Sequence, residues 1–339
     1  MADEGSDPGR SYRHRKDRPL NDDKQYLKKK QTMKTPQGIQ ARQGFELILL
    51  ASIWGASFMF MRIGSPEFGP VLFMAMRTLI ASLLLVPLLF LYRQQKALNG
   101  QWPKLFVVGA LNTAIPFVLF GYATLTLSAG LTSILNTTTP MFGVLVAYLW
   151  FKDKLSLNAV FGIILGCLGV YLLMYDKIAI APTAGEESNI LLPVLAVMGA
   201  ALCYAISANF TKRYLSHIKP LAQASGSQLA ATMLLTPVSL FFLPTSMPSA
   251  LAITSVVLLG TVCTGIAYII FFRLIAALGP ANAMSVTYLI PVFGVFWGAL
   301  FLNEVVTTSM LLGGGCILTG VALITGVIKL NKKKSAAKA

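Results

Sequence analysis

The sequence predicts an all-α integral membrane protein whose ten transmembrane helices form two inverted repeats of five helices each. The first observation is composition: 55% of the 339 residues are hydrophobic and only 12% are charged. The mean hydropathy is +0.67, and soluble domains carry about 25% charged residues, twice this share. The second observation is a series of long apolar runs, and the third is an internal repeat.

Each apolar run is long enough to cross the ~30 Å hydrocarbon core as a helix, which takes about 20 residues. Strands of a membrane barrel would be about half as long and would alternate in polarity, so helices are expected. The ten runs cover residues 45–63, 69–92, 104–123, 129–151, 157–175, 190–211, 220–243, 250–275, 281–302 and 308–328.

Both ends of the chain are polar and basic. Residues 1–44 hold 11 Lys and Arg against 6 Asp and Glu, and residues 329–339 hold five Lys and no acid. The first segment lacks the apolar core of a signal peptide, so we expect a disordered cytoplasmic tail; whether Met33 is the true start stays open. Neither tail interleaves basic and aromatic residues, so no nucleic-acid partner is expected.

Lys and Arg in the short connections predict the orientation. With the N-terminus in the cytoplasm, nine basic residues fall on the inner side and two, Arg62 and Lys177, on the outer side. Positive loops face the cytoplasm. The expected location is therefore the inner (plasma) membrane, with both termini cytoplasmic and the lipid bilayer as a constant partner.

The two apolar halves repeat each other, which gives a first repeat at 45–175 and a second at 190–328. The matching pairs are 150 residues apart in the first two spans and 151 apart afterwards. They include Pro70 and Pro220, Pro87 and Pro237, Ser57 and Ser207, Thr113 and Thr264, Pro140 and Pro291, Gly162 and Gly313, and Gly169 and Gly320. Because each half has five spans, the halves must enter the membrane in opposite orientations, an architecture typical of secondary transporters.

Short motifs in this order resemble the EamA-type permeases of the drug/metabolite transporter superfamily. They are Trp54-Gly-Ala-Ser-Phe58, Pro70 with Arg77, Asn136-Thr-Thr-Thr-Pro140, the glycines between Gly162 and Gly169, Pro291-Val-Phe-Gly294 with Glu304, and the glycines between Gly313 and Gly320. The resemblance implies that spans 1–4 and 6–9 surround a central cavity, that spans 5 and 10 lie at the periphery, and that small metabolites, amino acids or drugs are moved.

Arg77 is the one ionised residue well inside a predicted span. A charge at that depth costs at least ~2.5–3.5 kcal/mol on insertion scales and is therefore kept facing the bundle interior. Two interpretations stay open: a contact to an anionic or zwitterionic substrate or a gating partner, or a structural bond to backbone groups of another helix.

The other candidate substrate-binding residues are polar or aromatic groups within spans: Trp54, Ser57, Asn112, Asn136, Tyr204 and Tyr288. Trp54 and Tyr204 are repeat equivalents, which predicts flat walls on either side of a substrate. The alternative for the aromatic residues is ordinary packing. For the asparagines it is hydrogen bonding between helices, worth about 0.6 kcal/mol per bond.

Three further features have expected structural roles. Asp153 and Glu304 are repeat equivalents that either cap the helix following each of them or form salt bridges of a gate. The glycines of spans 5 and 10 predict close helix contact. Four isolated cysteines are expected to be free thiols, and neither a metal site nor a cofactor is expected.

These observations predict a secondary transporter that moves a small organic solute by alternating access and is not an enzyme. No Asp or Glu lies in the middle of a span, so proton antiport is not indicated, whereas uniport and coupling through the substrate's charge stay open. The alternatives are a membrane receptor or scaffold that transports nothing and, less favoured, an intramembrane enzyme. Substrate, direction and homo-oligomer formation stay open.

Overall fold

The computed structural model describes residues 41–152, 154–179 and 190–328. By contacts the chain divides into two units, residues 1–44 and residues 45–339. Of the first unit only the residues from Ala41 onward are described, and they begin the first helix. The predictions for residues 1–40 and for the tail 329–339 lie outside the described residues. The text below concerns the second unit, called here the helical body.

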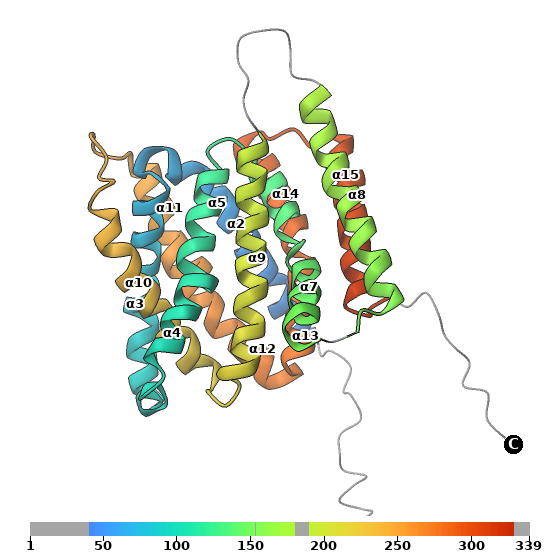
Figure 1. The fold of residues 1–339 in the computed structure, drawn as a ribbon. Helices are drawn as coiled ribbons and strands as arrows, with labels where there is room; N and C mark the ends of the chain where they lie inside the picture. The colour runs from blue at the N-terminus through green and yellow to red at the C-terminus, as the bar shows by residue number, and fades with distance from the viewer. Residues whose placement is uncertain (1–40, 153, 180–189, 329–339) are drawn as a thin grey trace, which may run out of the picture. The chain divides into compact units, whose positions relative to one another are not determined.

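Every regular element in the described ranges is a helix (Figure 1). The first half contains α2 (Ala41–Phe68), α3 (Pro70–Leu91), η1 (Gln95–Leu98), α4 (Trp102–Gly109), η2 (Ala110–Ala114), α5 (Ile115–Ala123), α6 (Ala129–Asn136), α7 (Thr139–Phe151) and α8 (Leu157–Ala179). The second half contains α9 (Leu191–Tyr214), α10 (Pro220–Ser239), α11 (Ala250–Gly260), η3 (Thr261–Ile266), α12 (Ala267–Leu278), α13 (Pro280–Ala283), η4 (Met284–Tyr288), α14 (Ile290–Leu302) and α15 (Thr308–Ile324).

Seven helical segments of the described chain are long and apolar enough to cross a membrane. Two more apolar helices, α14 and α15, are shorter. Helix α10 is not among the seven, and its sequence is more polar because it contains Gln223, Gln228 and several Ser and Thr residues. The all-helical, multi-span class is therefore confirmed, whereas the number of ten spans stays a prediction.

Two predicted spans are divided into shorter helices near a proline. The span at 129–151 is divided into α6 and α7 at Thr137, shortly before Pro140. The span at 281–302 is divided into α13, the 3₁₀ turn η4 and α14, shortly before Pro291. Proline has no backbone N–H and disfavours helical geometry in the residue before it. Pro140 and Pro291, which are repeat equivalents, therefore account for the two interruptions.

A π-helical turn interrupts the third span of each half, at η2 and at η3. A shift of 151 residues superimposes the first residue of η2 on the first residue of η3. Pro116 is the second residue after η2, and a shift of 151 residues places Ala267 at the equivalent position, directly after η3. In η3 the Thr264 hydroxyl donates to the carbonyl of Leu259, five residues earlier, at 2.9 Å. A proline thus accompanies the π-helical turn of the first half, and a threonine hydroxyl accompanies that of the second half. Single π-helical turns inside α-helices are frequent at functional sites.

Helices α8 and α15 are repeat equivalents, and they pack side by side through glycines (Figure 1). A Cβ atom on Gly169 would lie 2.6 Å from the Gly313 carbonyl oxygen, and a Cβ on Gly320 would lie 2.5 Å from that of Gly162. The predicted close glycine contact is confirmed. The residue numbers rise along one helix as they fall along the other, so the two helices run antiparallel.

Helices α3 and α10, also repeat equivalents, pack against each other as well, but through hydroxyl groups rather than glycines. The hydroxyls of Ser82 and Thr232 share a buried hydrogen bond of 3.0 Å between residues that are 150 positions apart. Close by, the Ser225 hydroxyl donates to the Leu85 carbonyl at 3.2 Å. Ser82 therefore bonds to its own repeat equivalent, and these two helices also run antiparallel.

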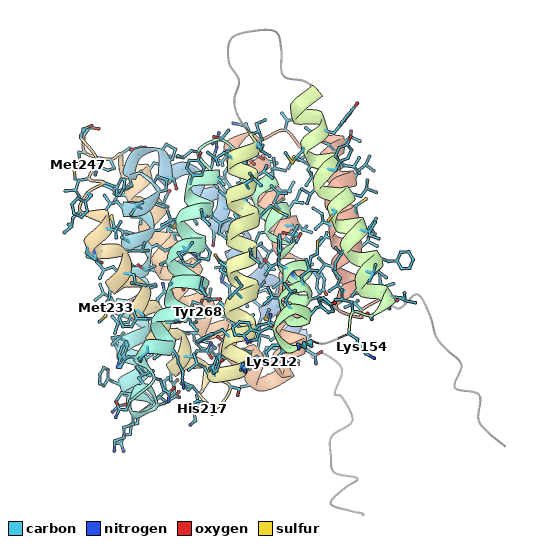
Figure 2. All side chains as sticks on the ribbon, viewed as in Figure 1. Lys154, Lys212, His217, Met233, Met247 and Tyr268 are labelled. Atoms are coloured by element: carbon cyan, nitrogen blue, oxygen red, sulfur yellow. The ribbon has the colours of Figure 1, made fainter. Side chains whose placement is uncertain are left out.

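The outer faces of the helical body carry large exposed apolar side chains. On α8 they include Phe161, Ile164, Leu168, Tyr171 and Tyr175. An apolar surface of this extent is typical of a face that contacts lipid. The labelled Lys154, Lys212 and His217 lie towards one end of the bundle, whereas Met247 lies at the opposite end (Figure 2).

Candidate substrate-binding site

Arg77 lies in α3 and is buried, with 5% of its surface exposed. Its Nε donates a 3.0 Å hydrogen bond to the Thr264 hydroxyl of η3. Its guanidinium carbon lies 3.6 Å from the centre of the Phe117 ring of α5, which is cation–π geometry. Arg77 thus joins α3 to the irregular turn of the second half and is covered by an aromatic ring of the first half.

Polar groups from further helices lie near this guanidinium. Tyr204 of α9, Tyr268 of α12 and Cys263 of η3 lie close enough to interact with its charge. Ser57 of α2 lies beside Cys263, and Tyr268 is labelled among the helices of the bundle (Figure 2). We call Arg77, Ser57, Thr264, Tyr204 and Tyr268, together with Phe117, the Arg77 cluster. It takes residues from both halves.

The Arg77 cluster contains polar atoms that are buried and unsatisfied. Among the described residues, the Arg77 Nη1 and the Ser57 hydroxyl are buried without a hydrogen-bond partner. Most buried polar atoms in proteins have a partner, so each exception requires an explanation. A ligand that accepts hydrogen bonds would provide one.

The structure brings three of the predicted site residues together in this cluster: Arg77, Ser57 and Tyr204. Tyr204 also packs on Phe120, with ring centres 5.8 Å apart. Trp54 lies one turn before Ser57 on α2, but its ring packs on Phe271 of α12 at 5.2 Å. Trp54 therefore contacts α12, the helix that carries Tyr268, whereas the described hydrogen bond and ring contact of Arg77 involve Thr264 and Phe117.

The remaining three predicted residues lie elsewhere in the helical body. Asn112 is half-buried in η2. Asn136 ends α6, and its side-chain oxygen is buried without a partner. The Tyr288 hydroxyl bonds to the hydroxyl of Thr325, just after α15, which makes a contact between helices at that position. Within the described chain, no hydrogen bond or ring contact joins these three residues to the Arg77 cluster.

Glu304 caps a helix, but a different one from the helix that the sequence predicted. Its carboxylate accepts 2.7 and 3.1 Å hydrogen bonds from the backbone N–H groups of Ala129 and Gly130, at the start of α6. The following helix, α15, is capped by Thr307 instead, which accepts from Met310. Glu304 therefore joins the second half to the first. Asp153 lies outside the described residues.

Sequence reasoning missed Thr264 as a partner of Arg77. Thr264 was recognisable only as the repeat equivalent of Thr113, whose own hydroxyl is buried without a partner in the structure. Phe117 and Tyr268 were visible as aromatic residues within spans, and Cys263 as an apolar group. Nothing in the spacing along the chain indicates that these side chains meet around one guanidinium.

No group of three or more His, Cys, Asp or Glu side chains comes together in a metal-binding arrangement among the described residues. All four cysteines are free thiols, of which Cys263 is buried. The Arg77 cluster presents a fixed positive charge, hydroxyl groups and aromatic faces, all of which can hold a ligand.

The fold and this cluster define a helical membrane protein with two repeated halves. The sequence pattern of the EamA-like transporter family matches residues 44–175 and again residues 191–326. The chain therefore belongs to the EamA-like transporter family, and the resemblance of the short motifs is confirmed.

Individual relatives are distant but match over nearly their full length. The "Uncharacterized transporter YoaV" of Bacillus subtilis is 23% identical, with 84% of this chain and 97% of the relative covered. The "Probable amino-acid metabolite efflux pump" of Escherichia coli K12 is also 23% identical, with 83% and 93% covered. A solved crystal structure shares the fold, with a TM-score of 0.57 at 19% identity over 84% of this chain and 96% of that one.

Proposed function

We propose that this chain is a secondary transporter that moves a small organic solute across the inner membrane by alternating access. In this proposal ten spans form two inverted five-helix halves, both termini face the cytoplasm, and the solute binds between the halves without covalent chemistry. Family membership supports transport as such. The mechanism rests on the arrangement of the helices.

The observation that carries the proposal is the antiparallel packing of repeat-equivalent helices. Helix α8 packs on α15 through Gly169 and Gly313, and α3 packs on α10 through Ser82 and Thr232. Opposed orientation of equivalent elements is what an inverted repeat requires. Two such halves can rock against each other and expose a site between them to either face in turn.

The position of the Arg77 cluster supports a site between the halves. Arg77, Ser57 and Phe117 come from the first half, whereas Thr264, Tyr204 and Tyr268 come from the second. Any rocking of one half against the other would change the distances within this cluster. A ligand held by both halves could therefore favour one arrangement over another.

A receptor or scaffold without transport is the alternative from another class. It would need no unsatisfied buried groups between the halves, because a solidly packed interface would serve it better. An intramembrane enzyme is less favoured, since the Arg77 cluster contains no carboxylate, histidine or metal ligand set among its described members. Transport is the function that uses both the repeat and the unsatisfied polar groups.

Solute flux into proteoliposomes tests the proposal. Vesicles containing the purified full chain should take up at least one member of a broad metabolite panel with saturable kinetics. Arg77→Ala and Trp54→Ala should each change that flux, whereas Lys154→Gln, which removes an exposed positive charge outside the cluster, should not. Wild-type flux no greater than that of empty vesicles across the panel would contradict transport.

A further inference from the structure

Among the side chains that the structure describes, none is a counter-ion for the positive charge of Arg77. The three acidic side chains described in the helical body bond elsewhere. Glu46 pairs with Arg273, Glu67 with Ser249, and Glu304 with the start of α6. The groups that interact with the Arg77 charge are Tyr204, Tyr268 and Cys263, none of them a carboxylate.

A buried guanidinium without an anion is an unfavourable arrangement. Buried charges in proteins are paired, because an unpaired charge loses its hydration without compensation. The cation–π contact with Phe117 and the single bond to Thr264 leave Nη1 without an acceptor. The planar guanidinium fork matches a carboxylate better than it matches a point anion.

The surroundings of the fork are aromatic. Phe117 lies on its face. Tyr204, which is close enough to interact with its charge, packs on Phe120, and Phe120 packs edge-on against Phe58 with ring centres 5.8 Å apart. Rings of this kind bind the hydrocarbon part of a ligand by burial and by offset stacking. The ligand should therefore combine an anionic group with an apolar, preferably aromatic, body.

The Arg77 cluster offers no partner for a positive charge on the ligand. An α-amino acid carries an ammonium group beside its carboxylate, and an ammonium next to Arg77 would be repelled. The three carboxylates whose side chains are described bond elsewhere, so none of them offsets that repulsion. The ligand that fits this environment is an anion rather than a zwitterion.

We infer that the Arg77 cluster binds an organic monocarboxylate with an apolar body, and that it binds such an anion more tightly than the corresponding amino acid. Arg77 anchors the carboxylate through its Nη1, and the Ser57 hydroxyl is a further donor. This inference rests on the proposed function in one respect: the bound anion is taken to be the transported solute. It distinguishes this chain from its Escherichia coli relative, whose name refers to amino-acid metabolites.

Three ligands with one carbon skeleton test the inference by calorimetry on the purified full chain in detergent. They are 3-phenylpropionate, its uncharged amide, and phenylalanine, which adds an ammonium group. A hydrogen-bonded charge should make 3-phenylpropionate bind about 10- to 100-fold more tightly than the amide. Phenylalanine should also bind more weakly than 3-phenylpropionate. Equal affinity for acid and amide, or tighter binding of phenylalanine, would overturn the inference.

Variants assign the effect to Arg77. R77Q should lose most of the preference for the acid, R77K should keep part of it because the charge remains without the fork, and K154Q should behave as wild type. If R77Q does not fold, the affinities of the wild type for the three ligands and the affinities of R77K still test the inference. Chloride is the control for an inorganic anion: chloride that displaces 3-phenylpropionate at equal concentration would overturn an organic ligand class.

Flux measurements separate this inference from the proposed function. Vesicles that transport an uncharged solute equally well in wild type and R77Q would leave transport standing and refute the anion site. Binding of 3-phenylpropionate that depends on Arg77, without flux of any solute, would support the site and refute transport. Arg77-dependent flux of 3-phenylpropionate supports both.

Discussion

At the scale of single residues, the bond from Arg77 to Thr264 is the contact that orients the guanidinium. Thr264→Val removes the acceptor but keeps the side-chain shape and the Arg77 charge. We expect the affinity for 3-phenylpropionate to fall by about tenfold, since a hydrogen bond to a charged group is worth about 1.5–3 kcal/mol. This loss should be smaller than that of R77Q, and calorimetry measures it.

Thr113→Val is the matched control, because Thr113 is the repeat equivalent of Thr264 and its hydroxyl has no partner. Replacing a buried, unpartnered hydroxyl with a methyl group should leave binding unchanged and stability unchanged or slightly higher. Equal effects of the two substitutions would mean that the Thr264 hydroxyl does not orient Arg77.

The Glu304 carboxylate gives a second prediction at this scale. It accepts two backbone N–H groups at the start of α6, where a negative charge also interacts favourably with the helix dipole. Glu304→Gln should lower the stability by about 0.5–2 kcal/mol, the range for losing a helix cap. The measurement is the thermal unfolding of the detergent-solubilised protein.

Glu67→Gln serves as the comparison, since Glu67 also accepts from a helix start, at Ser249, but is exposed. Water replaces an exposed bond of this kind readily, so its loss should change the melting temperature less than the loss of Glu304 does. A larger effect of Glu67→Gln would contradict the importance assigned to the Glu304 cap.

At the scale of helices, the antiparallel pair α8 and α15 depends on glycine at its crossing points. Gly169→Ala would place a Cβ 2.6 Å from the Gly313 carbonyl oxygen and 2.7 Å from Ile317. Because a backbone atom cannot move aside as a side chain can, the helices must separate. We expect a loss of about 1–3 kcal/mol, the range for overpacking, seen as a lower melting temperature.

Gly315→Ala in α15 is the matched control, as no atom lies within 4 Å of a Cβ added there. Alanine favours a helix over glycine by about 0.8–1.0 kcal/mol, so this variant should unfold at the same temperature or higher. Comparable destabilisation by both substitutions would indicate a loss unrelated to the contact between the two helices.

The sequence predicts which residues of these helices form contacts, but it does not predict which distant residue each of them contacts. The repeat register identified Gly162, Gly169, Gly313 and Gly320 as contact residues, because small side chains at helical spacing mark close packing. The sequence predicts that Glu304 either caps the helix that follows it or forms a salt bridge of a gate, whereas the N–H group of Gly130 that it accepts from lies 174 residues away along the chain. Patterns along the chain report on local structure, whereas the choice of partner depends on how distant helices pack.

The candidate site shows the same division. A charge in an apolar span indicates that Arg77 faces the interior, and this prediction is confirmed by its burial. The meeting of Thr264, Phe117 and Tyr268 around it depends on the crossing of α3 with η3 and α12. An arginine side chain is long enough to reach several neighbouring helices, so its position in a span leaves its partners undetermined.

At the scale of the whole molecule, the charge of the solute determines how the membrane potential acts on transport. If a monocarboxylate crosses alone while Arg77 stays in the protein, one negative charge moves in each cycle. A potential of 100 mV acts on one charge with about 2.3 kcal/mol, which corresponds to about a 50-fold concentration ratio at equilibrium. An inside-negative potential would therefore drive the anion outward.

Proteoliposomes with an imposed potassium diffusion potential test this prediction. Vesicles made positive inside should accumulate 3-phenylpropionate, and vesicles made negative inside should lose it, in both cases at equal pH across the membrane. A proton that accompanied the carboxylate would cancel the charge movement, so flux would follow an imposed pH gradient and ignore the potential. No acidic side chain lies mid-span in the sequence to carry such a proton, and we therefore expect the potential, not the pH gradient, to set the direction of transport.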